Sequence, residues 1–115
     1  LWMYKNGSLV LSTPVVTGNV AKETPTPPGN YHVYFMQRDR VLSDEDWDGS
    51  IYETPVAYWM AFNRGIGLHD APWRYSFGGT IYKSNGSHGC INMPPRLAAA
   101  AYDMIYIGFP VYVHY

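Results

Sequence analysis

The sequence predicts a mainly β domain, a β-sandwich or set of mixed β-sheets, with one helix after the loop that carries the single cysteine. Three observations predict this class. Runs of aromatic and β-branched residues recur between turn signals, and aromatic residues make up 17% of the chain, which suits pleated sheets. Apolar residues show a clear helical spacing only near residues 97–105. A chain of 115 residues is long enough for one domain with a sizeable core.

The N-terminal quarter predicts a hairpin, a strand and a loop. Asn6-Gly7 lies between two apolar runs within residues 2–11, and this pair suits the positive φ angles of a tight hairpin turn. A third strand is expected at 14–18. Residues 19–29 contain three prolines and no apolar period, so they predict a loop.

Three further runs predict the central strands. The run 31–37 carries bulky side chains on both faces, which favours a central position in a sheet. The run 56–62 has the strongest strand pattern of the chain, and 65–68 follows it after a short turn. We therefore expect a second hairpin that ends at His69.

An acidic run at 43–49 matches the first half of a calcium-binding loop. Pro55 occupies the position that should carry the bidentate glutamate, and no helical period flanks the run. The pattern therefore favours a solvated loop over a calcium site.

The C-terminal half predicts a long loop, the helix and a last strand. Residues 70–86 form a loop longer than compact domains usually contain, so it is expected to border a functional site. The helix is expected to begin at Pro94-Pro95 and to stop before Gly108, with 111–115 as the final strand. Its N-terminus would place partial positive charge near the thiol and favour the thiolate.

The charge and cysteine content exclude several functions. Eight basic and nine acidic residues give a formal charge of −1, which argues against a nucleic-acid partner. A single cysteine excludes an internal disulfide. No apolar run approaches the roughly 18 residues that a membrane-spanning helix requires.

The single cysteine lies in the stretch Ser-His-Gly-Cys-Ile-Asn at 87–92. A structural thiol usually has apolar neighbours, whereas a reactive one needs access and a nearby base. Gly89 gives access to Cys90, and His88 and His69 are two candidate bases. These residues point to nucleophilic catalysis.

The order His69, residues 70–86, then Ser-His-Gly-Cys-Ile-Asn resembles the signature of the L,D-transpeptidase (YkuD) catalytic domain. That family pattern is a histidine, a spacer of about this length, and Ser/Thr-His-Gly-Cys-hydrophobic-Asn/Arg. The segments 26–31 and 69–73 also resemble family segments, so the similarity runs from about Leu9 to the C-terminus. The resemblance implies a YkuD-like fold of the class predicted above.

The resemblance also implies an activity that needs no cofactor. Cys90 would attack the carbonyl of the third residue of a donor tetrapeptide stem in peptidoglycan and release the terminal D-alanine. The side-chain amine of a neighbouring stem would then attack the acyl-enzyme and make a 3→3 cross-link. Carbapenem β-lactams would acylate the same cysteine as covalent inhibitors, which links the family to cell-wall biogenesis, cell shape and β-lactam resistance.

The family match suggests catalytic roles for four residues of the site. Cys90 is the expected nucleophile and His69 the expected general base. The backbone N–H groups of Gly89 and Cys90 could bind the oxyanion. Ser87 could orient the ring of His69 as a third triad member or only shape the turn, and the backbone carbonyl of Asp70 is a competing orienting group.

Five further residues are candidates for substrate binding. His88 faces substrate or is structural, and Asn92 either contacts substrate or holds the loop. Trp59 and Phe62 are part of the core or line a groove. Trp73 is the best candidate for a groove wall because it lies in the loop just after the histidine.

Four alternative functions stay open. Water as acceptor would give an L,D-carboxypeptidase, and another Cys-His peptidase is conceivable, although papain-like enzymes place the cysteine before the histidine. A zinc site could use Cys90, His69, His88 and Asp70, but no typical ligand spacing supports it. The non-enzyme alternative is a cell-wall-binding module that uses only an aromatic groove.

We expect residues 1–115 to form a single catalytic domain of a protein that is truncated here at its N-terminus. A missing N-terminal segment would supply any membrane attachment. The resemblance implies an extracytoplasmic location, in the bacterial cell wall or periplasm. It does not distinguish stems that contain diaminopimelate from those that contain lysine.

Overall fold

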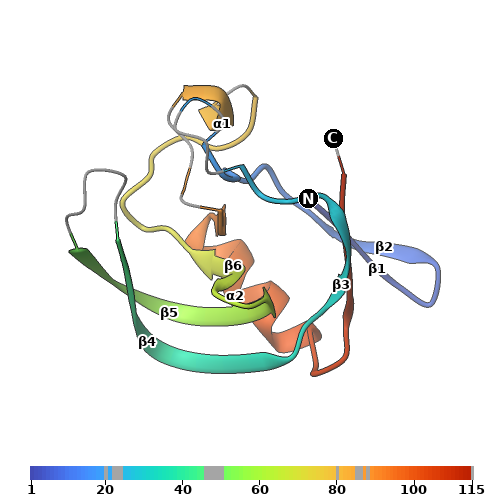
Figure 1. The fold of residues 1–115 in the computed structure, drawn as a ribbon. Helices are drawn as coiled ribbons and strands as arrows, with labels where there is room; N and C mark the ends of the chain where they lie inside the picture. Colours follow the sequence, from blue (N-terminus) through green and yellow to red (C-terminus); the bar gives the residue numbers. More distant parts are fainter. Residues whose placement is uncertain are drawn as a thin grey trace.

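The computed structural model describes residues 1–19, 21, 25–45, 51–79, 81–84, 87 and 89–114. Strands dominate this part of the chain, which confirms the predicted mainly β class (Figure 1). The elements are β1 (Trp2–Lys5), β2 (Ser8–Ser12), β3 (Gly29–His32), β4 (Phe35–Glu45), β5 (Ile51–Asn63), β6 (Ile66–Asp70), α1 (Ile81–Ser84), β7 (Ile91–Met93), α2 (Pro95–Met104) and β8 (Pro110–Val113).

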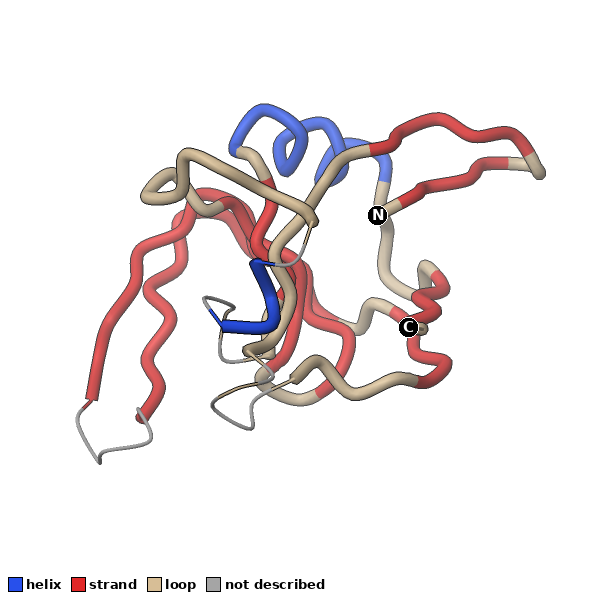
Figure 2. The backbone as a smooth tube through the Cα atoms, turned by 90° about the horizontal axis from the view of Figure 1, so that it is seen from above, coloured by secondary structure: helices blue, strands red, loops and turns tan. Residues whose placement is uncertain are grey.

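The strands form three sheets. β1 pairs with β2, β3 pairs with β8, and the main sheet has the order β4-β5-β6-β7. Every pair is antiparallel except β6 and β7, which run parallel. In Figure 2 the β1–β2 and β4–β5 hairpins extend away from the centre of the molecule, one on each side.

The N-terminal hairpin forms as predicted. Its turn residues Asn6 and Gly7 have φ angles of 52° and 79°, the positive pair that a two-residue turn needs to match strand twist. Met3 and Leu11 of this hairpin are buried in the main hydrophobic cluster. The hairpin is therefore tied to the domain by two apolar side chains.

The prediction of a strand at 14–18 is wrong. This segment makes only isolated bridges, Val16 to Asn92 and Gly18 to Ser87, the first antiparallel and the second parallel. The reason is the turn between these two partners, where Gly89 has a φ of 120°. A partner that reverses its course cannot offer a continuous ladder.

The prediction of a single central strand at 31–37 is also wrong. The chain changes sheets at Val33 and Tyr34, whose N–H groups bond Phe109 O at 2.8 Å and Ala61 O at 3.0 Å. β3 before this point pairs with β8, and β4 after it is an edge strand of the main sheet. Bulk on both faces therefore reflects a switch of sheets rather than a central position.

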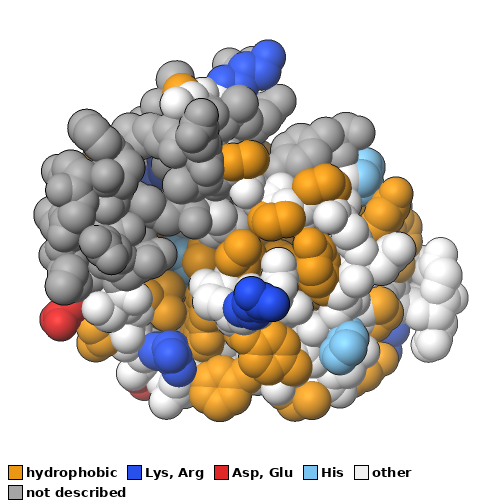
Figure 3. Space-filling view, viewed as in Figure 1, with side chains coloured by type: hydrophobic (Ala, Val, Ile, Leu, Met, Phe, Trp, Pro, Cys, Tyr) orange, Lys and Arg blue, Asp and Glu red, His pale blue; other side chains and the backbone are white. Residues whose placement is uncertain are grey.

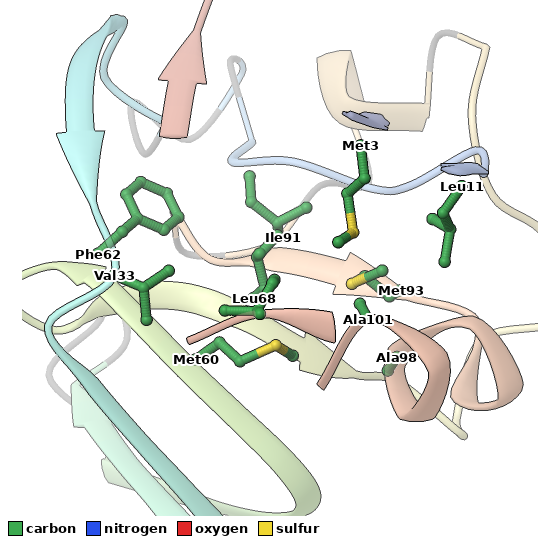
Figure 4. Packing of buried hydrophobic residues seen from close by; sticks show 11 residues of the cluster. Met3, Leu11, Val33, Met60, Phe62, Leu68, Ile91, Met93, Ala98 and Ala101 are labelled. Carbon is green, nitrogen blue, oxygen red and sulfur yellow. The ribbon is translucent and has the colours of Figure 1, made fainter. Parts of the chain in front are cut away.

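The core lies between α2 and one face of the main sheet (Figure 4). Met60, Leu68, Ile91 and Met93 are buried there. The predicted apolar face of the helix is confirmed, since Ala98, Ala101 and Ile105 belong to the same cluster. The helix ends at Met104, earlier than predicted, because Ile105 has extended dihedral angles.

The acidic run predicted as a solvated turn is partly strand, because β4 continues to Glu45. The rest of that run, 46–49, lies outside the described residues. No helix in the described part of the chain is long and apolar enough to cross a membrane. On the face seen in Figure 3, hydrophobic side chains cover much of the described surface and charged side chains are scattered among them.

Candidate active site

The site lies on the face of the main sheet opposite the core. His69 on β6 is the Cα partner of Asn92 on β7. Side chains alternate along each strand, and paired residues share a face. Because their neighbours Leu68 and Ile91 point into the core, His69 and Asn92 point to the other face. Sequence reasoning missed β7, since three residues give no period to detect.

Both ring nitrogens of His69 have polar partners. Nδ1 lies 2.8 Å from the carbonyl oxygen of Asp70, and Nε2 lies 3.2 Å from Nδ2 of Asn92. A carbonyl can only accept a hydrogen bond, so Nδ1 carries the proton and Nε2 accepts one from the amide. This tautomer leaves the lone pair of Nε2 directed to the sheet face that carries Asn92.

Arg74 fixes the amide of Asn92 from the other end. Its Nε donates to Oδ1 of Asn92 at 2.8 Å, and an arginine can only donate. Oδ1 must therefore face Arg74, and Nδ2 must face His69. Asn92 is fully buried. It therefore orients His69 in addition to holding the loop.

Arg74 was not predicted, because nothing in the spacing of the long loop signals a contact with Asn92. The nearest signal is its charge, since it is the one arginine or lysine in the stretch 65–79. An isolated cation in a loop that borders a site is a reasonable candidate for such a contact.

The alternatives for Ser87 are distinguished by its partners. Its hydroxyl donates to the carbonyl of Cys90 and accepts from the N–H of Gly89 at 3.2 Å. The carbonyl of Asp70, not Ser87, bonds the ring of His69. The geometry thus supports a turn-shaping role for Ser87. The N–H of Gly89 must therefore break its hydrogen bond to Ser87 before it can bind an oxyanion.

Thr26 links the loop that contains Cys90 to the segment that contains Gly18. Its fully buried hydroxyl donates to the carbonyl of Gly89 at 2.6 Å and accepts from the N–H of Gly18 at 2.9 Å. The sequence indicated only a loop at this position. The two bonds hold the turn before Cys90 against a distant part of the chain.

Cys90 is half-buried and lies directly before β7. Its Sγ lies 3.5 Å from the carbonyl oxygen of Gly65, and its side chain packs against the small cluster of Val56, Trp59 and Ala61. Trp59 is the Cα partner of His69, so a side chain that packs against Trp59 lies on the face that carries His69. The expected nucleophile and base therefore lie on the same side of the sheet.

The prediction that the N-terminus of α2 favours the thiolate of Cys90 is wrong. β7 separates Cys90 from Pro95, the first residue of α2, and three extended residues span ~10 Å. The helix also packs on the core face. Because the field of a helix end falls off within its first turn, α2 does not account for thiolate formation.

The carboxylate of Asp70 supports the base indirectly. Its Oδ1 accepts hydrogen bonds from the N–H groups of Ala57 and Tyr58, both at 2.9 Å. The side chain is buried and joins β6 to β5. These two bonds fix the end of β6, and with it the Asp70 carbonyl that orients His69.

Two tryptophans flank the imidazole. The ring centroids of Trp59 and Trp73 lie 6.0 and 5.9 Å from that of His69. Trp59 is 4% exposed and Trp73 is 46% exposed, so Trp59 forms a floor and Trp73 an outer wall. Phe62 does not line this face. It is buried in the main core (Figure 4), and its ring centroid lies 5.3 Å from that of Tyr31.

His88 lies outside the described residues, so the structure says nothing of its expected contact with substrate. Among the described residues, no group of three His, Cys, Asp or Glu side chains is placed to hold a metal ion.

Burial sets the protonation of His69. Loss of solvent lowers its pKa below the usual value, the bond and charge of Asp70 oppose this, and the charge of Arg74 lowers the pKa further. The net direction is downward, so the imidazole is neutral near pH 7. A neutral imidazole can take a proton from a thiol, as general-base catalysis requires.

These contacts define a class of protein. A half-exposed cysteine and a neutral, doubly oriented histidine on one face of a sheet form a site for cysteine-dependent acyl transfer. Comparison with known proteins gives the family. The model of the YkuD L,D-transpeptidase catalytic domain matches residues 1–113. The chain belongs to this family.

Curated relatives come from Mycobacterium tuberculosis. L,D-transpeptidase 1 is 29% identical over 116 residues, which cover 95% of this chain and 44% of the relative. Probable L,D-transpeptidase 3 is 34% identical over 98 residues, covering 79% of this chain and 35% of the relative. The chain thus spans less than half the length of these relatives.

Solved structures resemble the whole chain. The catalytic domain of the Enterococcus faecium L,D-transpeptidase acylated by ertapenem is 41% identical, with a TM-score of 0.85, covering 98% of this chain and 87% of that one. The Ldtfm–avibactam carbamoyl enzyme is 40% identical, with a TM-score of 0.92, covering 99% of this chain and 44% of that one. The fold predicted from the signature is confirmed.

Proposed function

We propose that this chain catalyses L,D-transpeptidation of peptidoglycan stem peptides through an acyl-enzyme on Cys90. One observation carries the proposal. In a chain of this family, His69 is held as the Nδ1–H tautomer, and it lies on the same sheet face as Trp59, against which Cys90 packs. That arrangement supplies a base for the thiol without any cofactor.

In the first half-reaction, Sγ of Cys90 attacks the carbonyl of the third residue of a donor tetrapeptide. Asn92 yields its bond to Nε2 of His69, which then takes the thiol proton. The tetrahedral intermediate collapses as the C–N bond breaks, and the terminal D-alanine leaves with the proton from His69. A thioester remains on Cys90.

In the second half-reaction, the side-chain amine of a neighbouring stem attacks the thioester. It loses a proton to His69, and Cys90 leaves as a thiolate that His69 reprotonates. The product is a 3→3 cross-link. Water in place of the amine would give an L,D-carboxypeptidase, and the exposed wall formed by Trp73 favours a site open enough for a second peptide.

The substrate supports an extracytoplasmic location. Stem peptides are cross-linked in the bacterial wall, so we place the reaction in the cell wall or periplasm. Fractionation of cells that express the whole protein would test this, and recovery of the active protein only from the cytosol would contradict it.

Carbapenems should acylate Cys90. The relative from E. faecium was solved acylated by ertapenem, and the same nucleophile is present here. A thiolate that opens the strained amide stays attached as a thioester, so the mass of the protein should rise by one intact drug.

Two mass-spectrometric measurements test the proposal. The first follows a tetrapeptide donor with an amine acceptor, and the expected product is the cross-linked peptide with loss of D-alanine. The second follows the intact protein after a carbapenem, with Cys90→Ala beside it. A folded wild-type protein that forms no cross-link and no adduct, or an adduct that persists in Cys90→Ala, would overturn the assignment.

A further inference from the structure

Arg40 on β4 has an unusual setting. Its guanidinium carbon lies 5.6 Å from the ring centroid of Phe35 and 5.9 Å from that of Trp59. Its Nη1 donates to Oε1 of Gln37 at 2.9 Å. Aromatic faces and one neutral amide thus hold the cation, in the manner of a cation–π clamp.

The charge of Arg40 is not matched by an acidic partner among the described residues. Arginine has five N–H donors, and the described part of the chain supplies one acceptor, Gln37. Its Nε is buried without a hydrogen-bond partner there. Since buried donors are nearly always satisfied in native proteins, this guanidinium has capacity for an anionic ligand.

Arg40 lies on the same face of the sheet as the active site. It pairs with Val56 on β5, and Val56 belongs to the cluster against which Cys90 packs. The ring that Arg40 covers is that of Trp59, whose centroid is 6.0 Å from that of His69. One tryptophan therefore separates the guanidinium from the catalytic imidazole.

The neighbouring cation Arg38 provides a contrast. Its guanidinium lies 4.9 Å from the ring of Tyr58, and Tyr58 packs on the main core and on Tyr102 of α2 at 5.3 Å. Arg38 therefore lies on the core side of the same strand. The two arginines take opposite faces because Asp39 between them has a φ of 53° and no Cα partner on β5, which interrupts the alternation of side chains. It has the same charge and a similar aromatic contact, but it is directed away from the site.

We propose that Arg40 binds a carboxylate of the donor stem peptide while the third-residue carbonyl lies at Cys90. The inference rests on the proposed function, which supplies a peptide with free carboxylates. An extended peptide advances ~3.3–3.6 Å per residue, so the separation set by Trp59 corresponds to a group within a few residues of the scissile bond. The planar guanidinium suits a carboxylate better than a lysine would.

Two carboxylates of the donor have the required chemistry. One is the C-terminal carboxylate of the leaving D-alanine, and the other is a side-chain carboxylate near the scissile bond, as in diaminopimelate. Donors with one or the other converted to an amide distinguish these sources without changing the scissile bond.

The test compares Arg40→Gln with the matched control Arg38→Gln on three donors: the free acid, the C-terminal amide and the side-chain amide. With the free acid, kcat/KM of Arg40→Gln should fall about 10- to 100-fold, the range for a charge-assisted hydrogen bond. On the amide of the carboxylate that Arg40 binds, the loss should shrink to less than about 3-fold, since that contact is already weakened. Arg38→Gln should match the wild type on all three donors.

Equal losses on all three donors would show that Arg40 only supports the fold, and no loss on any would show that it binds no carboxylate. Thermal unfolding of each variant reports folding. If Arg40→Gln does not fold, Arg40→Lys takes its place, and its smaller loss should show the same dependence on one amide.

Failure of the proposed function gives a different result. A folded wild-type protein that turns over none of the donors would overturn the transfer reaction but not the carboxylate site. Calorimetric binding of the same three peptides to Cys90→Ala, with and without Arg40→Gln, then decides the Arg40 proposal. Equal affinity of the two proteins for the free acid would overturn it.

Discussion

The two faces of the main sheet use the same strands for opposite purposes. Met60, Leu68 and Met93 pack against α2 on one face, whereas His69 and Asn92 on the other are buried but hydrogen-bonded. A buried apolar side chain stabilises by leaving water, but a buried polar one requires a partner for each group. Apolar stabilisation is therefore concentrated on one face, and the residues expected to react lie on the other.

Substitution of the expected nucleophile should cause the largest loss of activity. Cys90→Ala and Cys90→Ser should lower acyl transfer by at least about 10³-fold, as the loss of a nucleophile does elsewhere, and should leave the unfolding temperature nearly unchanged. Mass spectrometry of the stem-peptide products and thermal unfolding measure the two effects. Near-wild-type turnover by Cys90→Ala would end the nucleophile hypothesis.

The next largest loss of activity should come from His69 and should distinguish it from His88. His69→Ala should lose about 10²- to 10⁴-fold in kcat/KM, the range for a general base, and His88→Ala should lose far less. Steady-state kinetics of both variants on one donor give the ratio. Equal losses, or the reverse order, would move the base from His69 to His88.

A substitution on the core face should lower stability and leave activity nearly unchanged. Met60→Ala removes a fully buried side chain and should destabilise the domain by about 2–5 kcal/mol, because it leaves a cavity. Its kcat per folded molecule should stay close to the wild-type value. Denaturant unfolding and active-site titration measure these quantities, and a loss of kcat as large as that of His69→Ala would show that the two faces are coupled.

The local elements were predictable from sequence and the long-range contacts were not. The hairpin turn at Asn6-Gly7 and the apolar face of α2 follow from rules that act within a few residues. The change of sheet at Val33 depends on Phe109, which is far away in the chain. Nothing local reports such a pairing.

The candidate site divides in the same way. Cys90 and His69 could be predicted as nucleophile and base because reactive residue types and their order carry a family signature. The sequence left open whether Ser87 or the Asp70 carbonyl would orient the ring, and it did not show that Asn92 would bond Nε2. It also did not show that Phe62 would enter the core. These outcomes depend on which face of β5, β6 and β7 each side chain takes, and a one-residue shift of register reverses the faces.

The smallest predicted effect concerns the hydrogen bonds that hold Asn92 against His69. Arg74→Met removes the donor that orients Asn92 and a positive charge that lowers the pKa of His69. At the plateau, kcat/KM should fall about 2- to 10-fold, the range for one net hydrogen bond.

The pH profile separates this role from a merely structural one. Without the charge of Arg74, the pKa of His69 should rise, because Asp70 still favours the imidazolium. The base is then neutral only at higher pH, so the acid limb of kcat/KM, which reports the Cys90–His69 pair, should move upward in pH. Arg96→Met on the exposed start of α2 is the control and should leave the limb in place. An unmoved limb in Arg74→Met, or the same movement in both variants, would show that Arg74 does not act through His69.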